Sequence, residues 1–115
     1  MIKKLAALIV ASLLMAPTAN AGPRLPDTSR LQPATVDLLH YVAEKYPEVP
    51  EIGGWRPDRI PDHPSGRALD IMVYANGGLG DRIAADLRAN KAKLGIRYLL
   101  WRVPQHYDHI HVCVH

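Results

Sequence analysis

The sequence predicts a small α+β domain with a mostly antiparallel sheet and two main helices. Two stretches, 33–46 and about 81–93, repeat apolar residues at the spacing of a helix. Shorter apolar or alternating runs predict four strands. These strands are expected at 51–56, 68–74, 97–103 and 108–115. The resulting order of helix, strand, strand, helix, strand, strand is typical of the α+β class.

The first helix is expected over 33–46, because Pro33 is acceptable in a first helical turn and Pro47 stops the run. Its apolar stripe would consist of Val36, Leu39, Ala43 and Tyr46. The segment 57–65 has three prolines and no periodicity, which predicts a loop.

The second helix is expected to follow a glycine-rich turn at 76–80 and to be capped by Asp81. It would run to about Lys93 and end at Gly95. Its inward residues would be Ile83, Ala84, Leu87 and Leu94. The turn sequence GGLGD lacks both the GxGxxG and the Walker spacing, so a phosphate site is not expected there.

Residues 1–21 have the features of a signal peptide. Lys3 and Lys4 precede a largely apolar run, 5–16, and Ala19-Asn20-Ala21 places small residues at a cleavage site. The run is shorter than the roughly 20 apolar residues of a permanent bilayer span, so cleavage after Ala21 is favoured over an uncleaved anchor. The mature chain is therefore expected to be secreted, or periplasmic and cell-wall associated, without a permanent membrane anchor.

Removing residues 1–21 leaves 94 of the 115 residues, enough for one small domain. We expect an extended leader at 22–32 and the domain at 33–115. The mature chain has 12 basic and 11 acidic residues, a net charge near +1 that gives no nucleic-acid footprint. A single cysteine, Cys113, cannot form an internal disulfide.

Two segments carry residues suited to a chemical site: 61–70, PDHPSGRALD, and 108–115, DHIHVCVH. Proline and glycine in the first segment favour a loop entering a strand, which would aim His63 and Asp70 at one point. Asp70 interrupts an otherwise apolar strand, where a carboxylate without a partner is costly and a metal ligand is not. Alternation in the second segment places His109 and His111 on one face of a strand.

This group of imidazoles and carboxylates favours a metal site. Two imidazoles and one carboxylate suit a divalent transition ion, zinc first, and three protein ligands leave a fourth position for water. A lone histidine or aspartate is more often a capping or surface residue, but five such residues in two short runs favour metal binding. Cys113 would share the face of His111, either near the site or, as we favour, as a small buried hydrophobe.

The motifs also carry a resemblance to a known family. His63, Gly66, Ala68 and Asp70 fit an HxxGxAxD pattern, and the later HIH fits a third ligand. In these motifs the chain resembles the zinc D-Ala-D-Ala carboxypeptidases and dipeptidases of the hedgehog/DD-peptidase fold. The resemblance spans about 53–114 and implies Zn²⁺ bound by His63, Asp70 and His111. It also implies a metallopeptidase acting as a carboxypeptidase or endopeptidase on peptidoglycan peptides.

The resemblance further implies three catalytic residues. Asp108 stands where the family has an acid three residues before the last ligand, so it would be the general base. Arg56, in GGWR, matches a family arginine and would hold a carbonyl oxygen or a substrate carboxylate. His109 would steady the tetrahedral intermediate. Each residue also has a structural interpretation: an orienting partner of a ligand histidine for Asp108, a salt bridge for Arg56 and simple packing for His109.

Two other classes of function remain open at the level of the sequence. Non-catalytic relatives in the same fold imply a zinc-stabilised module that binds cell-wall peptide or protein, although the acid at Asp108 weighs against it. The letters DHIH also occur in metal-dependent nucleases of the HNH type. There they should open a ββα unit, but only four residues follow His111, and the mature chain is nearly neutral.

Overall fold

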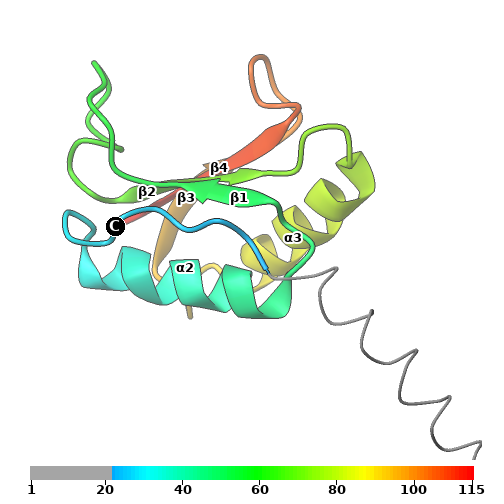
Figure 1. The fold of residues 1–115 in the computed structure, drawn as a ribbon, viewed down its shortest axis with the longest axis horizontal. Helices are drawn as coiled ribbons and strands as arrows, with labels where there is room; N and C mark the ends of the chain where they lie inside the picture. Colours follow the sequence, from blue (N-terminus) through cyan, green and yellow to red (C-terminus); the bar gives the residue numbers. More distant parts are fainter. Residues whose placement is uncertain (1–21) are drawn as a thin grey trace, which may run out of the picture.

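Two helices pack on one face of a four-stranded antiparallel sheet in the computed structural model, which describes residues 22–115 (Figure 1). The helices are α2 (Pro33–Lys45) and α3 (Gly77–Ala89), and the strands are β1 (Glu51–Gly53), β2 (Ala68–Met72), β3 (Ile96–Leu100) and β4 (His109–Val114). The strand order is β1-β2-β4-β3, and each neighbouring pair is antiparallel. The predicted α+β class, with two helices and an antiparallel sheet, is confirmed.

The register between β2 and β4 separates an apolar face from a polar face. Successive side chains of a strand point to opposite faces. Ile71 opposes Ile110, and both belong to the core beneath the sheet. Asp70 opposes His111, so these two polar side chains lie together on the face that the helices leave uncovered.

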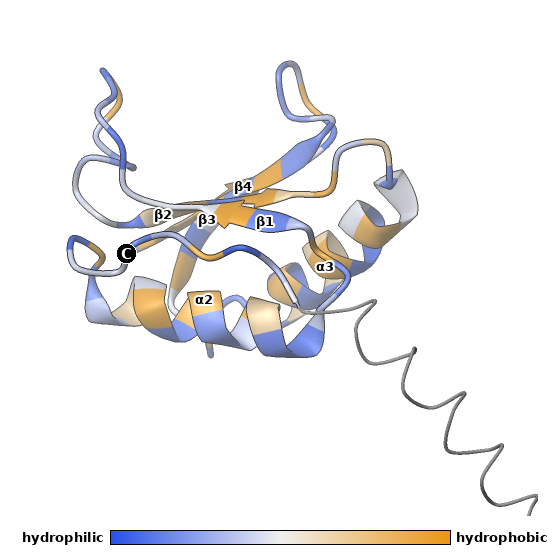
Figure 2. Cartoon of the chain, in the orientation of Figure 1, coloured by the Kyte–Doolittle hydropathy of each residue, from blue (hydrophilic) through white to orange (hydrophobic). Residues whose placement is uncertain are grey.

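The core between the helices and the sheet is built from branched apolar side chains. Helix α2 buries Leu38, Leu39 and Val42, and α3 buries Leu79, Ile83 and Leu87. Each fully buried side chain of this kind contributes about 1.5–3 kcal/mol through removal from water. Figure 2 shows the alternating hydrophobic and hydrophilic bands of both helices. The apolar stripe predicted for the first helix is therefore only partly correct. Leu39 is fully buried, whereas Val36, Ala43 and Tyr46 are half-buried.

Helix α3 begins earlier than the sequence pattern predicted. The prediction of a turn at 76–80 and a cap at Asp81 is wrong, because the helix starts at Gly77 and Asn76 caps it by accepting a hydrogen bond from Leu79 N at 3.2 Å. The glycine at position 80 serves packing instead of a turn. A Cβ there would lie 2.3 Å from the ring of Trp101, so only glycine lets the helix approach this indole.

Strand β2 and helix α3 end earlier than predicted, because local hydrogen bonds terminate them. The amides of Val73 and Tyr74 both donate to the carbonyl of Asp108, at 2.9 and 2.8 Å, and Tyr74 has a φ of 51°. Strand β2 therefore stops at Met72. Helix α3 stops at Ala89, short of the predicted Lys93.

The predicted leader, 22–32, runs beside the edge strand β1. Arg24 N donates to the carbonyl of Pro50 at 3.0 Å, and Ile52 N donates to the carbonyl of Arg24 at 2.9 Å. Residues 1–21, predicted to be a signal peptide, lie outside the described residues. Within residues 22–115, no helix is long and apolar enough to cross a membrane.

Two loops rise from the sheet on the side away from the helices (Figure 1). The β1–β2 loop comprises residues 54–67, and the β3–β4 loop comprises residues 101–108. Both loops are largely hydrophilic in Figure 2. The polar face of the sheet, with Asp70 and His111, therefore lies beside two polar loops.

Candidate metal centre

The structure brings together the three residues predicted to bind a metal. His63 from the β1–β2 loop, Asp70 from β2 and His111 from β4 are all buried, and one ligand atom from each lies within 4.8 Å of the others. Asp70 Oδ2 lies 3.2 Å from His63 Nε2, and Asp70 Oδ1 lies 3.2 Å from His111 Nδ1. This cluster of two imidazole nitrogens and one carboxylate could hold a metal ion.

One atom of His63 is the strongest indication that this cluster binds a cation. Its Nδ1 lies 2.8 Å from the carbonyl oxygen of Gly54, which can only accept, so Nδ1 carries the proton and Nε2 carries a lone pair. Among the described residues, this Nε2 is the single buried side-chain nitrogen or oxygen without a hydrogen bond. A lone pair that faces the Asp70 carboxylate is unfavourable unless a proton or a metal ion lies between them.

The ring of His111 is oriented by Asp62, a carboxylate that was not among the predicted site residues. Asp62 Oδ2 lies 3.0 Å from His111 Nε2. Asp62 is buried and also accepts a hydrogen bond from the hydroxyl of Tyr98. With Nε2 donating to Asp62, Nδ1 of His111 is left to face Asp70, which is the arrangement that orients metal-binding histidines in proteins.

The protonation states of the cluster favour a bound cation. Burial raises the pKa of Asp70, but its contacts with the rings of His111 and His63 and its hydrogen bond from Arg56 outweigh burial and hold that pKa far below its usual range. Burial lowers the pKa of His111, yet hydrogen bonds with Asp70 and Asp62 raise it overall. Burial raises the pKa of Asp62, but hydrogen bonds with Tyr98 and His111 lower it overall, so two ionised carboxylates lie beside these imidazoles and attract positive charge.

Arg56 touches the cluster from its rim. Its Nη1 lies 2.5 Å from Asp70 Oδ2, and its Nη2 lies 3.8 Å from Asp58. The side chain is 50% exposed. Arg56 thus forms the salt bridge that was one interpretation of this residue, while half of its surface faces solvent.

Asp108 and His109 form a pair beside the cluster. Asp108 is 58% exposed, and its Oδ1 lies 2.8 Å from His109 Nδ1. With Nδ1 donating to Asp108, the Nε2 of His109 carries a lone pair and lies 3.8 Å from Asp70 Oδ1. Asp108 therefore reaches the cluster through the imidazole of His109.

A cleft of about 280 Å³ opens over His63 and His111. Both loops contribute to its walls. The lining residues are Arg56, Asp58, Ile60, Asp62, His63, Tyr98, Leu100, Gln105, His106 and His111. His106 and Tyr98 were not predicted as site residues, because neither belongs to a motif and each reaches the cleft only through the folded sheet.

The backbone around Gly66 holds the loop that delivers His63. Gly66 has a φ of +75°, and a Cβ at this position would lie 2.1 Å from the carbonyl oxygen of Arg30. Its own carbonyl accepts hydrogen bonds from Thr35 Oγ1 at 2.7 Å and from Gln32 N at 2.9 Å. The glycine of the HxxGxAxD pattern is therefore required by the fold.

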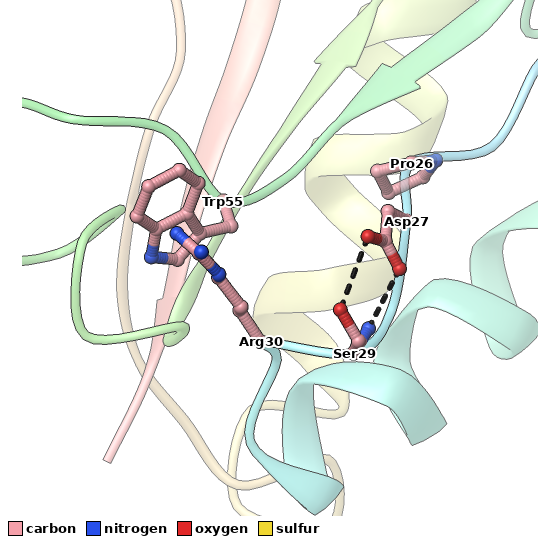
Figure 3. A pocket seen from close by; sticks show the side chains of 5 residues that line it. All are labelled: Pro26, Asp27, Ser29, Arg30 and Trp55. Carbon is pink, nitrogen blue, oxygen red and sulfur yellow. Dashed lines mark hydrogen bonds between the residues drawn. The ribbon is translucent and has the colours of Figure 1, made fainter.

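A second pocket lies beside Trp55, away from the metal cluster (Figure 3). The guanidinium of Arg30 stacks on the indole of Trp55, with its carbon 4.2 Å from the ring centroid. Asp27 accepts a hydrogen bond from Ser29 N at 2.9 Å in the same pocket. Trp101, the other tryptophan, is buried against α3, so neither indole lines the metal cleft.

Cys113 is fully buried two residues beyond His111. Burial raises the pKa of its thiol. Its sulfur contacts Arg97 Nη2 at 3.9 Å and does not belong to the metal cluster. The structure supports the interpretation of Cys113 as a small buried hydrophobe.

Comparison with known proteins identifies one family. The family model described as VldE, C-terminal domain, matches residues 27–109. This range contains His63 and Asp70 and ends two residues before His111. No curated protein and no solved structure matches the chain.

Proposed function

The chain belongs to the VldE C-terminal domain family, and we propose that it is an exported zinc-dependent peptidase that cleaves peptidoglycan stem or cross-link peptides. The observation that carries this proposal is the buried Nε2 of His63, which faces Asp70 without a hydrogen bond. The resemblance of the HxxGxAxD and HIH motifs to zinc D-Ala-D-Ala peptidases supports the substrate class.

The ligand set supports zinc among the divalent metals. Nitrogen from two imidazoles and oxygen from one carboxylate match zinc, and three protein ligands are typical of a catalytic site. A bound zinc ion would supply an activated water and polarise a peptide carbonyl. His63, Asp70 and His111 would hold the ion, and Asp62 would keep the His111 ring in place through Nε2.

The residues around the cluster can bind the substrate and move a proton. Arg56 presents a half-exposed, permanently charged guanidinium to the cleft, where it would bind a carbonyl oxygen or a carboxylate of the peptide. The pair of Asp108 and His109 would accept a proton at Nε2 of His109, while Asp108 stabilises the resulting imidazolium. In this proposal Asp108, expected from the sequence to be the general base itself, would act through the ring of His109, and His109, expected to steady the tetrahedral intermediate, would take up the proton.

Digestion of purified peptidoglycan tests the proposal. The mature chain, loaded with one equivalent of zinc, is incubated with peptidoglycan, and new peptide termini are identified by mass spectrometry. We expect new termini with the wild type, none with His63→Ala, and full activity with His40→Ala, whose imidazole is exposed on α2. Release of D-Ala would identify a carboxypeptidase, and new internal termini an endopeptidase.

Absence of cleavage by the zinc-loaded wild type would contradict the peptidase. If such an inactive protein still bound peptidoglycan fragments, the binding-module alternative would take its place. Zinc content below one per chain that does not fall further in His63→Ala would contradict the proposed ligands.

Substitution of Asp108 tests the proton-transfer pair. Asp108→Asn keeps the size of the side chain but removes the negative charge that stabilises a protonated His109. We expect turnover to fall by about 100-fold with zinc content unchanged. Turnover and zinc occupancy are measured on the same samples. Unchanged turnover in a zinc-replete Asp108→Asn would exclude the pair from catalysis, and activity restored by excess zinc would instead assign Asp108 to metal binding.

A further inference from the structure

His106 lines the cleft but is neither a candidate metal ligand nor part of the pair of Asp108 and His109. It belongs to the β3–β4 loop and lines the cleft together with His63 and His111. Its ring centroid lies 4.9 Å from that of His109 and 6.0 Å from that of His111. The side chain therefore stands in the cleft wall, next to the rings of the candidate site.

The loop that carries His106 has an unusual backbone. Arg102 and Gln105 have φ angles of 57° and 69°, in the left-handed region that residues with side chains seldom occupy. Such conformations persist where the surroundings hold them and are common at functional sites. Here the hydrogen bonds from Arg102 N to the His106 carbonyl, at 2.7 Å, and from His106 N to the Val103 carbonyl, at 2.8 Å, hold the loop closed.

The base of the loop is anchored to helix α3. Asp81 accepts hydrogen bonds from Trp101 Nε1 and Arg102 Nε, both at 2.8 Å. Asp81, which was predicted to cap the second helix, thus anchors the β3–β4 loop. This anchor gives His106 a defined position over the cleft.

One nitrogen of His106 is free to bind a ligand. Its Nδ1 lies 2.9 Å from the carbonyl oxygen of Pro104, so Nδ1 donates and Nε2 carries a lone pair in the neutral ring. In the part of the chain from 22 to 115, the structure gives this Nε2 no hydrogen-bond partner. His106 therefore presents a hydrogen-bond acceptor from the β3–β4 loop, whereas Arg56 presents only donors from the β1–β2 loop.

We propose that His106 is a substrate-contacting residue whose Nε2 accepts a hydrogen bond from a backbone N–H of the peptide in the cleft. An extended peptide offers both a carbonyl acceptor and an N–H donor. Arg56 supplies a donor and His106 an acceptor for these two groups, and both side chains line the cleft. The inference rests on the proposed function for the identity of the ligand, a peptidoglycan peptide.

Peptide binding by matched histidine variants tests this inference. The probe is a muropeptide purified from digested peptidoglycan, titrated calorimetrically into metal-depleted protein so that no turnover occurs. We expect His106→Ala to raise Kd by about 3-fold to 10-fold, the effect of losing one neutral hydrogen bond. His106→Gln, whose amide oxygen can accept, should restore most of the affinity, and His40→Ala should leave Kd unchanged.

The zinc-loaded protein provides a second readout. His106→Ala should raise KM more than it lowers kcat, and its zinc content and thermal midpoint should match those of the wild type. Equal Kd and equal KM in His106→Ala and wild type would overturn the inference while leaving the peptidase intact. Binding without cleavage by the wild type would refute the peptidase alone, and absence of both binding and cleavage would refute both proposals.

Discussion

Two aspartates, the half-buried Asp86 and the buried Asp70, each lie among several polar side chains, and they differ in whether all of those side chains have hydrogen-bond partners. Asp86 on α3 accepts hydrogen bonds from Tyr41 at 2.8 Å, Tyr46 at 2.5 Å and Asn90 at 2.8 Å, and pairs with Lys45 at 2.9 Å. These polar groups all have partners in the Asp86 cluster.

The Asp70 cluster also gathers several polar groups but leaves one of them without a hydrogen bond. Asp70 contacts His63, His111 and Arg56, yet the Nε2 of His63 has no hydrogen bond. Because buried polar atoms in folded proteins are nearly always paired, the Asp86 cluster is explained by structure alone. The unpaired Nε2 of His63 marks the Asp70 cluster as a candidate ligand site.

The satisfied cluster joins the two helices. Tyr41, Lys45 and Tyr46 come from α2 and its C-terminal cap, whereas Asp86 and Asn90 come from α3 and its cap. Although burial acts to raise the pKa of Asp86, its hydrogen bonds lower it to about 2. The pKa of Tyr46 rises to about 12, through burial and its bond to Asp86. This cluster ties α2 to α3, and no chemical step is needed to account for it.

The largest expected difference between the two aspartates is the effect of their substitution on zinc binding. Asp70→Asn should reduce zinc from one per chain to a level close to zero, whereas Asp86→Asn should keep one. Metal analysis after dialysis checks this. Chelation should also lower the thermal midpoint of wild type and Asp86→Asn, because zinc at 1,000 times its Kd stabilises the fold by about 4 kcal/mol. A midpoint of Asp70→Asn that responds equally to chelation would contradict the assignment.

The free energy of unfolding of the metal-free protein should instead depend mainly on Asp86. Asp86→Ala leaves two tyrosine hydroxyls and Lys45 without their shared partner, so we expect a loss of about 2–3 kcal/mol in the free energy of unfolding. Urea denaturation of metal-free protein measures it, and Asp37→Ala, on the exposed face of α2, serves as the control. A loss no larger than that of the control would show that the Asp86 cluster does not stabilise the helices.

The two clusters should also respond to pH in opposite directions, with the smallest effect of the series. The folded pKa of Asp86 is depressed, so its contribution is present above about pH 4 and is lost as the pH falls towards 2. The folded pKa of His111 is raised, so in metal-free protein its contribution is present below about pH 6.5 and is lost as the pH rises through the raised value.

Urea denaturation across pH checks these signs. The difference between wild type and Asp86→Asn should shrink below pH 4, and the difference between metal-free wild type and His111→Gln should shrink above pH 6.5. The reverse trend in either pair would show that the cited hydrogen bonds do not control that group.

The sequence by itself determined the class of fold and the three residues that the structure brings together as a candidate metal site. Apolar spacing located both helices and all four strands, because local periodicity reports which side of an element is buried. The presence of His63, Asp70 and His111 in two short motifs was also readable, since a carboxylate inside an apolar strand and an HxH alternation are local signals. Element ends were less accurate, because caps and packing contacts decide them.

Only the tertiary structure decided which side chains complete the site. Asp62 meets His111 across 49 positions of sequence, through the position of a loop that has no periodicity. His106 reaches the cleft because residues 102 and 105 adopt left-handed backbone conformations. Asp81, which was expected to cap a helix, instead accepts a hydrogen bond from Arg102 and anchors that loop. The Asp108 carboxylate forms a hydrogen bond with Nδ1 of His109 at the start of β4. Each of these contacts depends on strand register or loop closure, which no local pattern encodes.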